Sequence, residues 1–124
     1  MHQSVLSTGA SSGIGEECAV YLAHKGFRVF AAARRIDKLN GLTAVGAGKI
    51  TPVQMDVTDA ASIDAALARI KDEGVTIYGL VNNAGAALMG PVERPALDDW
   101  RALFETPSTR SRACRIRAIS RCCR

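Results

Sequence analysis

The chain has 124 residues, of which 48% are hydrophobic and 23% charged, and its formal net charge is +4. This length fits one domain, and the composition is that of a globular protein. The sequence contains neither a long apolar run nor a charged-then-apolar leader, so we expect a cytoplasmic protein with no membrane partner. Four cysteines are too few for a disulfide scaffold.

The basic charge is concentrated at the C-terminus. Residues 1–106 carry 10 Lys and Arg against 12 Asp and Glu, whereas residues 107–124 carry 6 arginines and no acid. We therefore divide the chain into a slightly acidic domain over 1–106 and a tail over 107–124 that is rich in arginine, serine and cysteine. Any account of the basic charge concerns the tail alone.

Apolar runs alternate with helix-forming segments along the domain. Strands are predicted over 3–8, 27–32, 50–55 and 77–81, and Pro52 requires the third strand to lie at a sheet edge. Helices are predicted from the first glycine-rich loop to residue 25, over 36–42, and up to Gly74 from an N-cap at Thr58 or Asp59. A last helix is predicted to open at Pro95.

Strands separated by helices imply right-handed crossovers and a parallel sheet. No internal repeat is present. We predict an α/β fold, a Rossmann-like parallel sheet truncated after about four βα units, which is half of a doubly wound fold.

A glycine-rich loop joins the first predicted strand to the first predicted helix. It runs Thr8-Gly9-Ala10-Ser11-Ser12-Gly13-Ile14-Gly15. Glycines allow the backbone to approach a pyrophosphate closely, and a helix N-terminus offers free N–H groups to phosphates. A tight turn without a ligand is the alternative, but the strand before and the helix after the loop favour a binding site.

The second predicted strand is followed by Ala33, Arg34 and Arg35. A carboxylate at this place would bind the adenosine ribose of NAD, and none is present. A guanidinium can instead bind a 2′-phosphate in bidentate fashion, so Arg34 favours NADP over NAD. The alternative is a pair of solvated arginines.

Three segments in this order and spacing resemble the short-chain dehydrogenase/reductase family: Thr8–Gly15, Asp56-Val57 and Asn82-Asn83-Ala84-Gly85. The resemblance covers roughly residues 4–106. It implies a dinucleotide cofactor, an adenine site beside Asp56 and Val57, and a sheet-stabilising role for the last segment. The cofactor-binding residues that we expect are Gly9, Ser11, Ser12, Gly13, Ile14, Gly15, Arg34, Asp56, Val57, Asn83, Ala84 and Gly85.

The catalytic residues that the resemblance implies are not recognisable in this chain. The family transfers a hydride between nicotinamide and an alcohol/carbonyl pair, using a Tyr-x-x-x-Lys pair, an upstream serine and an asparagine. Tyr21 and Lys25 have this spacing but lie in the first predicted helix, so we interpret them as a packed tyrosine and a solvated lysine. We expect no catalytic residue in the chain.

The family pattern stops at Pro107, inside the last predicted helix. One hypothesis is that residues 107–124 are a disordered or out-of-frame tail; the other is a functional basic arm that binds polyanions. The tail cysteines Cys114, Cys122 and Cys123 have neither a nearby histidine nor Cys-x-x-Cys spacing, so we expect no metal site. The first hypothesis is favoured, and nucleic acid is then not an expected partner.

Three hypotheses of function follow. The first is the cofactor-binding part of an NADP-preferring oxidoreductase, truncated before its catalytic residues and inactive alone. The second is a non-catalytic nucleotide-binding module with a basic arm, and the third is a protein that complements a separately made second half. Because the fourth strand would lie at an exposed edge, we expect marginal stability and self-association.

Overall fold

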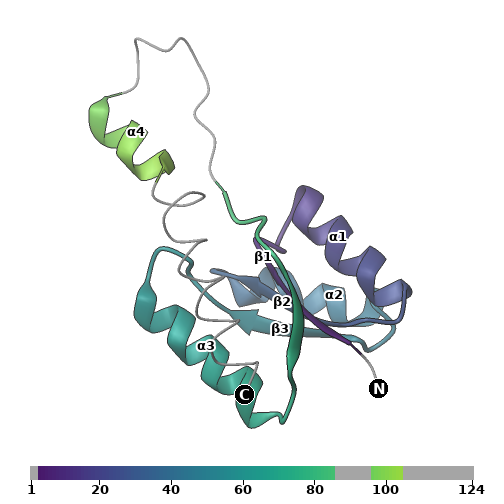
Figure 1. The fold of residues 1–124 in the computed structure, drawn as a ribbon. Coiled ribbons are helices and arrows are strands. Elements are labelled where there is room, and N and C mark those ends of the chain that lie inside the picture. The colour runs from purple at the N-terminus through teal and green to yellow at the C-terminus, as the bar shows by residue number, and fades with distance from the viewer. Residues whose placement is uncertain (1–2, 86–95, 105–124) are drawn as a thin grey trace.

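The structure, a computed structural model, describes residues 3–85 and 96–104. Pro95 and the tail over 107–124 lie outside the described residues, so the division of the chain at residue 106 stays a prediction. The described residues form a sheet with helices on both faces (Figure 1). Helices α1 (Gly13–His24) and α2 (Asn40–Val45) cover one face and α3 (Ala60–Asp72) covers the other.

The sheet has four parallel strands in the order β3-β2-β1-β4. Each strand agrees with its predicted range to within one residue at either end. Pro52 lies in the edge strand, where its missing N–H is tolerated, as predicted. The strands are β1 (Ser4–Thr8), β2 (Arg28–Ala33), β3 (Ile50–Gln54) and β4 (Ile77–Val81).

Helices α1 and α3 begin and end where local signals predict, whereas the helix predicted over 36–42 is a 3₁₀ helix followed by α2, which ends at Val45. Asp59 is the N-cap of α3, and its Oδ1 accepts a hydrogen bond from the Ala61 N–H at 3.0 Å. Gly26 and Gly74 follow α1 and α3 with φ of +99° and +67°, as expected of glycines after a helix. The elements are α1 (Gly13–His24), the 3₁₀ helix η1 (Ile36–Leu39), α2 (Asn40–Val45), α3 (Ala60–Asp72) and α4 (Leu97–Phe104).

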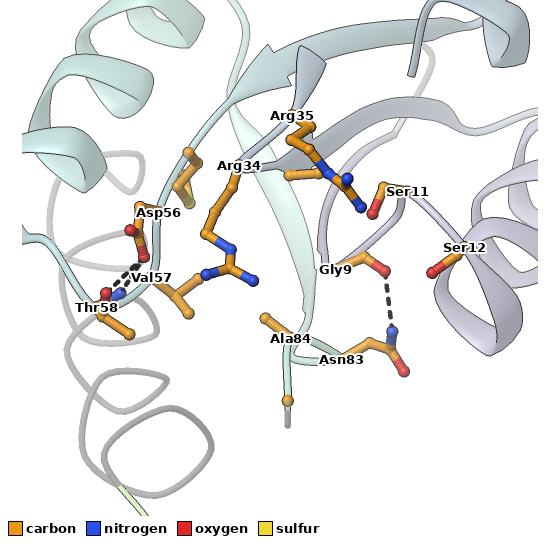
Figure 2. A pocket seen from close by; sticks show the side chains of 13 residues that line it. Gly9, Ser11, Ser12, Arg34, Arg35, Asp56, Val57, Thr58, Asn83 and Ala84 are labelled. Atoms are coloured by element: carbon orange, nitrogen blue, oxygen red, sulfur yellow. Dashed lines mark hydrogen bonds between the residues drawn. The ribbon is translucent and has the colours of Figure 1, made fainter. Parts of the chain in front are cut away.

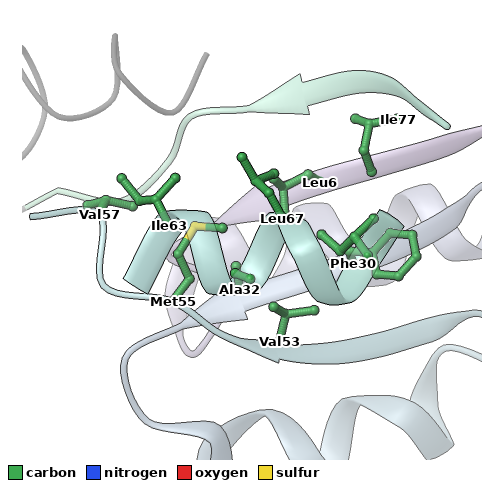
Figure 3. Close-up of a cluster of buried hydrophobic side chains, with 11 residues drawn as sticks. Leu6, Phe30, Ala32, Val53, Met55, Val57, Ile63, Leu67 and Ile77 are labelled. Atoms are coloured by element: carbon green, nitrogen blue, oxygen red, sulfur yellow. The ribbon is translucent and has the colours of Figure 1, made fainter. Parts of the chain in front are cut away.

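The central strands are buried on both faces, which explains their unbroken apolar sequence. In β2, Phe30 and Ala32 contact the cluster under α3, whereas Val29 and Ala31 contact the cluster under α1 and α2. Figure 3 shows the α3 cluster, in which the helix packs its apolar stripe onto the sheet. The stripe consists of Ile63, Ala66, Leu67 and Ile70.

Strand β4 lies at an edge of the described sheet, as expected, and is only partly buried. Only Ile77 is buried; Leu80 and Val81 are half-buried, and Tyr78 is 70% exposed. The reason is that β4 is the outermost strand of the described sheet, so one side lacks neighbours. None of the helices within residues 3–85 and 96–104 combines the length and the apolar composition that a membrane-spanning helix requires.

Candidate functional site

The loops at the carboxyl ends of the strands enclose a cavity of about 390 Å³ (Figure 2). In open parallel sheets ligands bind at this end, outside the strand termini. The walls come from the loops after all four strands, which lie far apart in the sequence. The lining residues are Gly9, Ser11, Ser12, Ala33, Arg34, Arg35, Met55, Asp56, Val57, Thr58, Asn83, Ala84 and Gly85.

Most of the predicted cofactor-binding residues line this cavity. Gly13, Ile14 and Gly15 do not. Gly15 is buried in the first turn of α1, whereas the Ile14 side chain is 82% exposed beside the loop. The structure thus brings predicted residues from four separate sequence segments to one cavity, and Gly13, Ile14 and Gly15 lie outside its lining.

The glycines of the loop are required for different reasons. Gly9 has φ of +65°, and an added Cβ would lie 2.8 Å from the Ala84 Cα. Gly13 also has positive φ, at +58°, but has open space where a Cβ would be. Gly15 has no room at all, because a Cβ there would overlap the Gly9 carbonyl oxygen and the Asn83 Nδ2. The loop backbone therefore packs tightly on the segment after β4 on one side and leaves space on the other.

The Thr8 hydroxyl joins the glycine loop to the segment after β4. This buried group donates to the Val81 carbonyl at 3.3 Å and accepts from the Asn83 and Ala84 N–H groups at 3.1 and 3.2 Å. The Asn83 Nδ2 in turn donates to the Gly9 carbonyl at 3.2 Å (Figure 2). These bonds fix two walls of the cavity relative to each other.

The first turn of α1 is available to an anion. Ser12, the N-cap residue, has an extended φ of −167° and makes no side-chain capping hydrogen bond. No other side chain of the described residues caps this turn. Helix N-termini carry a partial positive charge and unpaired N–H donors, so this end of α1 is suited to a phosphate group.

Two guanidinium groups form the basic wall of the cavity. The Arg34 side chain extends toward Val57, and Arg35 lies toward Ser11 (Figure 2). Neither forms a salt bridge within the part of the chain that the structure describes. The wall can therefore bind an added anion without first breaking an ion pair.

Sequence reasoning missed four lining residues: Ala33, Arg35, Met55 and Thr58. Each lies beside a predicted site residue at the end of β2 or β3. Their position next to predicted site residues could have identified them, because a chain that leaves a strand turns across the cavity mouth and presents consecutive residues to it.

Asp56 is held in its charged form by its own turn. Its Oδ1 accepts from the Thr58 hydroxyl at 2.6 Å and from the Thr58 N–H at 2.9 Å. These hydrogen bonds lower the pKa of Asp56 below its ordinary value; partial burial opposes them, and the positive charge of Arg34 adds to them.

A pH dependence of stability follows from Asp56. A carboxyl whose pKa is lowered on folding stabilises the fold above its unfolded pKa, and the stabilisation is lost as the pH falls through the folded value. We therefore expect the free energy of unfolding to fall below about pH 4, the ordinary range of an aspartate. Urea titrations of the wild type and Asp56→Asn between pH 6 and 3 would measure this free energy. If it falls with decreasing pH equally steeply in both proteins, Asp56 does not have this role.

Tyr21 and Lys25 lie outside the cavity. Tyr21 lies on the outer face of α1 and Lys25 directly follows the helix, with the Lys25 Nζ 5.3 Å from the centre of the Tyr21 ring. The interpretation of Tyr21 as a packed residue was wrong, because it is 61% exposed. Among the described residues no group of three His, Cys, Asp or Glu could hold a metal ion; the tail cysteines lie outside these residues.

These features define an α/β domain of the Rossmann-like class, with a loop and helix N-terminus shaped for phosphates. The short chain dehydrogenase family matches residues 3–111, so the chain belongs to that family. A short-chain dehydrogenase structure from Streptomyces avermitilis superposes with a TM-score of 0.87 at 32% identity, over 98% of this chain and 44% of that one.

Two relatives of this chain differ in how much of their own length it matches. The "Probable NADP-dependent dehydrogenase in aabA 3'region" of Dichelobacter nodosus is 40% identical over 82% of this chain and 97% of its own. The NADP-dependent 3-hydroxy acid dehydrogenase YdfG of Shigella flexneri is 37% identical over 82% of this chain and only 42% of its own. The chain thus spans less than half of the longer relative.

Proposed function

We propose that this chain binds NADP in the cavity and belongs to an oxidoreductase that acts on an alcohol/carbonyl pair. The observation that carries the proposal is that one cavity combines a close-packed glycine loop, an uncapped helix N-terminus and two guanidinium groups that form no salt bridge among the described residues. NADP-dependent relatives support the same cofactor.

Different groups of residues suit different chemical parts of the proposed ligand. The glycine loop and the start of α1 suit the pyrophosphate, with Gly9, Ser11, Ser12, Gly13, Ile14 and Gly15 around it. Arg34 suits a 2′-phosphate, and Arg35 adds positive charge beside it. Asp56 and Val57 suit the adenine, since the carboxylate accepts amino protons and the valine supplies an apolar surface. Asn83, Ala84 and Gly85 form the wall of the cavity after β4.

We further propose that the 124 residues bind NADP without transferring a hydride. The cofactor would supply the hydride in its reduced form, NADPH, or accept it as NADP, but a tyrosine of lowered pKa is needed near it to move the proton. Of the two tyrosines, Tyr21 lies on the outer face of α1 and Tyr78 on β4, and neither lines the cavity. Mixing the chain with NADPH and a panel of carbonyl compounds should give no loss of absorbance at 340 nm; turnover would refute this part.

Binding is tested by calorimetric titration of the 124-residue chain with NADPH. We expect one site per chain and weaker binding of NADH, because NADH lacks the 2′-phosphate. Titration at two salt concentrations is informative, since a charge-assisted site weakens as salt rises. Absence of heat and of any ligand-induced rise in Tm would contradict the proposal.

Arg34→Glu should reverse the cofactor preference. The substitution removes a guanidinium that can donate hydrogen bonds to the 2′-phosphate. It adds a carboxylate that repels this phosphate but can accept a hydrogen bond from a ribose hydroxyl. We expect NADPH affinity to fall by about 2 kcal/mol, roughly thirtyfold, with NADH affinity equal or higher. Arg69→Glu on α3, outside the cavity, is the charge-matched control. Equal losses for both cofactors would show that Arg34 does not distinguish them.

A further inference from the structure

The turn that follows β3 holds Asp56 by all of its polar atoms except one. Its backbone N–H donates to the Ser62 Oγ at 2.9 Å, and its carbonyl oxygen accepts from the Asp59 N–H at 3.1 Å. One carboxylate oxygen, Oδ1, accepts from both the hydroxyl and the N–H of Thr58 (Figure 2). The other oxygen, Oδ2, accepts no hydrogen bond from the described residues, and Asp56 lines the cavity. The carboxylate is thus fixed through one oxygen and has the other available to a ligand.

Thr58 acts on this carboxylate from the surface of the domain. Its side chain is exposed and also lines the cavity. Its hydroxyl lies 2.6 Å from the Asp56 Oδ1, which is short for a hydrogen bond and typical of an ionised acceptor. The last torsion of an aspartate side chain is broad, so a carboxylate held less firmly can rotate. The Thr58 hydroxyl therefore limits where Oδ2 can be offered to a ligand.

We infer that Thr58 is a positioning residue through which Asp56 selects adenine over hypoxanthine, the ring with a carbonyl oxygen in place of adenine's amino group. This inference rests on the NADP binding proposed above and adds a base specificity to it. A carboxylate only accepts hydrogen bonds, so it pairs with the amino group and repels the carbonyl oxygen. Hypoxanthine also carries an N–H at the neighbouring ring atom, which a carboxylate could reach by rotating. Holding Oδ1 in place prevents that second pairing.

The ionised state of Asp56 contributes to the same selection. A protonated carboxyl can donate to the hypoxanthine carbonyl, so only the ionised form excludes that ring. The hydroxyl and the N–H of Thr58 lower the pKa of Asp56, partial burial opposes them, and Arg34 adds to them. Thr58 therefore favours adenine both through the position of the carboxylate and through its charge.

The test compares two dinucleotides by calorimetric titration of the 124-residue chain. One is NADP, and the other is nicotinamide hypoxanthine dinucleotide phosphate, which is identical except for its hypoxanthine ring. We expect the wild type to bind NADP at least tenfold more tightly. Thr58→Val keeps the shape of an exposed side chain but removes its hydroxyl, so the chain should keep its fold while this ratio falls below threefold. Thr58→Ser should restore the ratio, and Thr43→Val, at an exposed threonine of α2 outside the cavity, should leave it unchanged.

Asp56→Asn gives a second readout of the same selection. Its side-chain amide can donate to the hypoxanthine carbonyl, which a carboxylate cannot do. The preference should therefore shift by at least tenfold toward the hypoxanthine dinucleotide relative to the wild type. An unchanged preference would mean that Asp56 does not distinguish the two rings and would overturn the inference.

The remaining outcomes separate this inference from the proposed function. Equal affinity of the wild type for the two dinucleotides would overturn the inference and leave NADP binding in place. A wild-type ratio in Thr58→Val would also overturn it. An equal loss of affinity for both dinucleotides in that variant, together with a lower Tm, would show a structural role instead. If neither dinucleotide binds to the wild type, the proposed function fails and this inference fails with it.

Discussion

Thr8→Val should destabilise the fold although the two side chains have nearly the same shape. Valine cannot accept from the Asn83 and Ala84 N–H groups, which Thr8 Oγ1 binds at 3.1 and 3.2 Å. Leaving a buried donor unpaired costs about 1–3 kcal/mol, so we expect the free energy of unfolding to fall by about 2–4 kcal/mol. NADPH affinity should fall as well, because the wall of the cavity after β4 loses its fixed position.

The neighbouring residue supplies the control. Ser7 is fully buried on the same strand, and its hydroxyl has no hydrogen-bond partner among the described residues. Ser7→Ala removes an unsatisfied polar group and should leave stability unchanged or raise it. Urea unfolding of both variants, with Thr8→Ser as the variant that keeps the hydroxyl, measures the contrast. A Thr8→Val protein as stable as the wild type would show that the hydroxyl is not a structural link.

Gly15→Ala should disrupt the loop through a single methyl group. The added Cβ would overlap the Gly9 carbonyl oxygen and the Asn83 Nδ2, so the loop, α1 or the segment after β4 must shift. Overpacking of this kind costs about 1–3 kcal/mol. Because the shift falls on the phosphate-binding loop, we expect NADPH affinity to fall by about tenfold or more, equivalent to about 1.4 kcal/mol.

Gly41→Ala is the matched substitution, since Gly41 also lies in a helix but has open space where a Cβ would be. Alanine is the better helix former, so this variant should gain about 0.5–1 kcal/mol and bind NADPH unchanged. Thermal unfolding and calorimetry of the two variants compare them directly. Equal behaviour of Gly15→Ala and Gly41→Ala would mean that the close approach at Gly15 does not constrain the loop.

The sequence allowed the order of elements to be predicted because each signal is local. The N-cap at Asp59, the glycines after α1 and α3, and the edge position required by Pro52 depend on a few neighbouring residues. The parallel sheet then followed from the alternation of strands and helices, and the sheet brought the three motif segments to one end.

What could not be predicted depends on contacts between distant segments. The Thr8 hydroxyl bonds to residues 73 to 76 positions away, and no local pattern marks it as a link. Arg35 faces the cavity only because of how the chain leaves β2 into η1. Tyr21 was expected to be packed, and its exposure follows from which elements lie next to α1, which spacing does not encode.

The most direct test of NADP binding is to map it on the ¹⁵N-labelled 124-residue chain by NMR. We expect saturating NADP to shift the amide signals of Gly9–Gly15, Arg34, Asp56, Val57 and Asn83–Gly85 and to leave those of α3 in place. Shifts confined to residues 107–124 would assign binding to the basic arm instead. Signals that do not move at all would contradict the proposal that this cavity holds the cofactor.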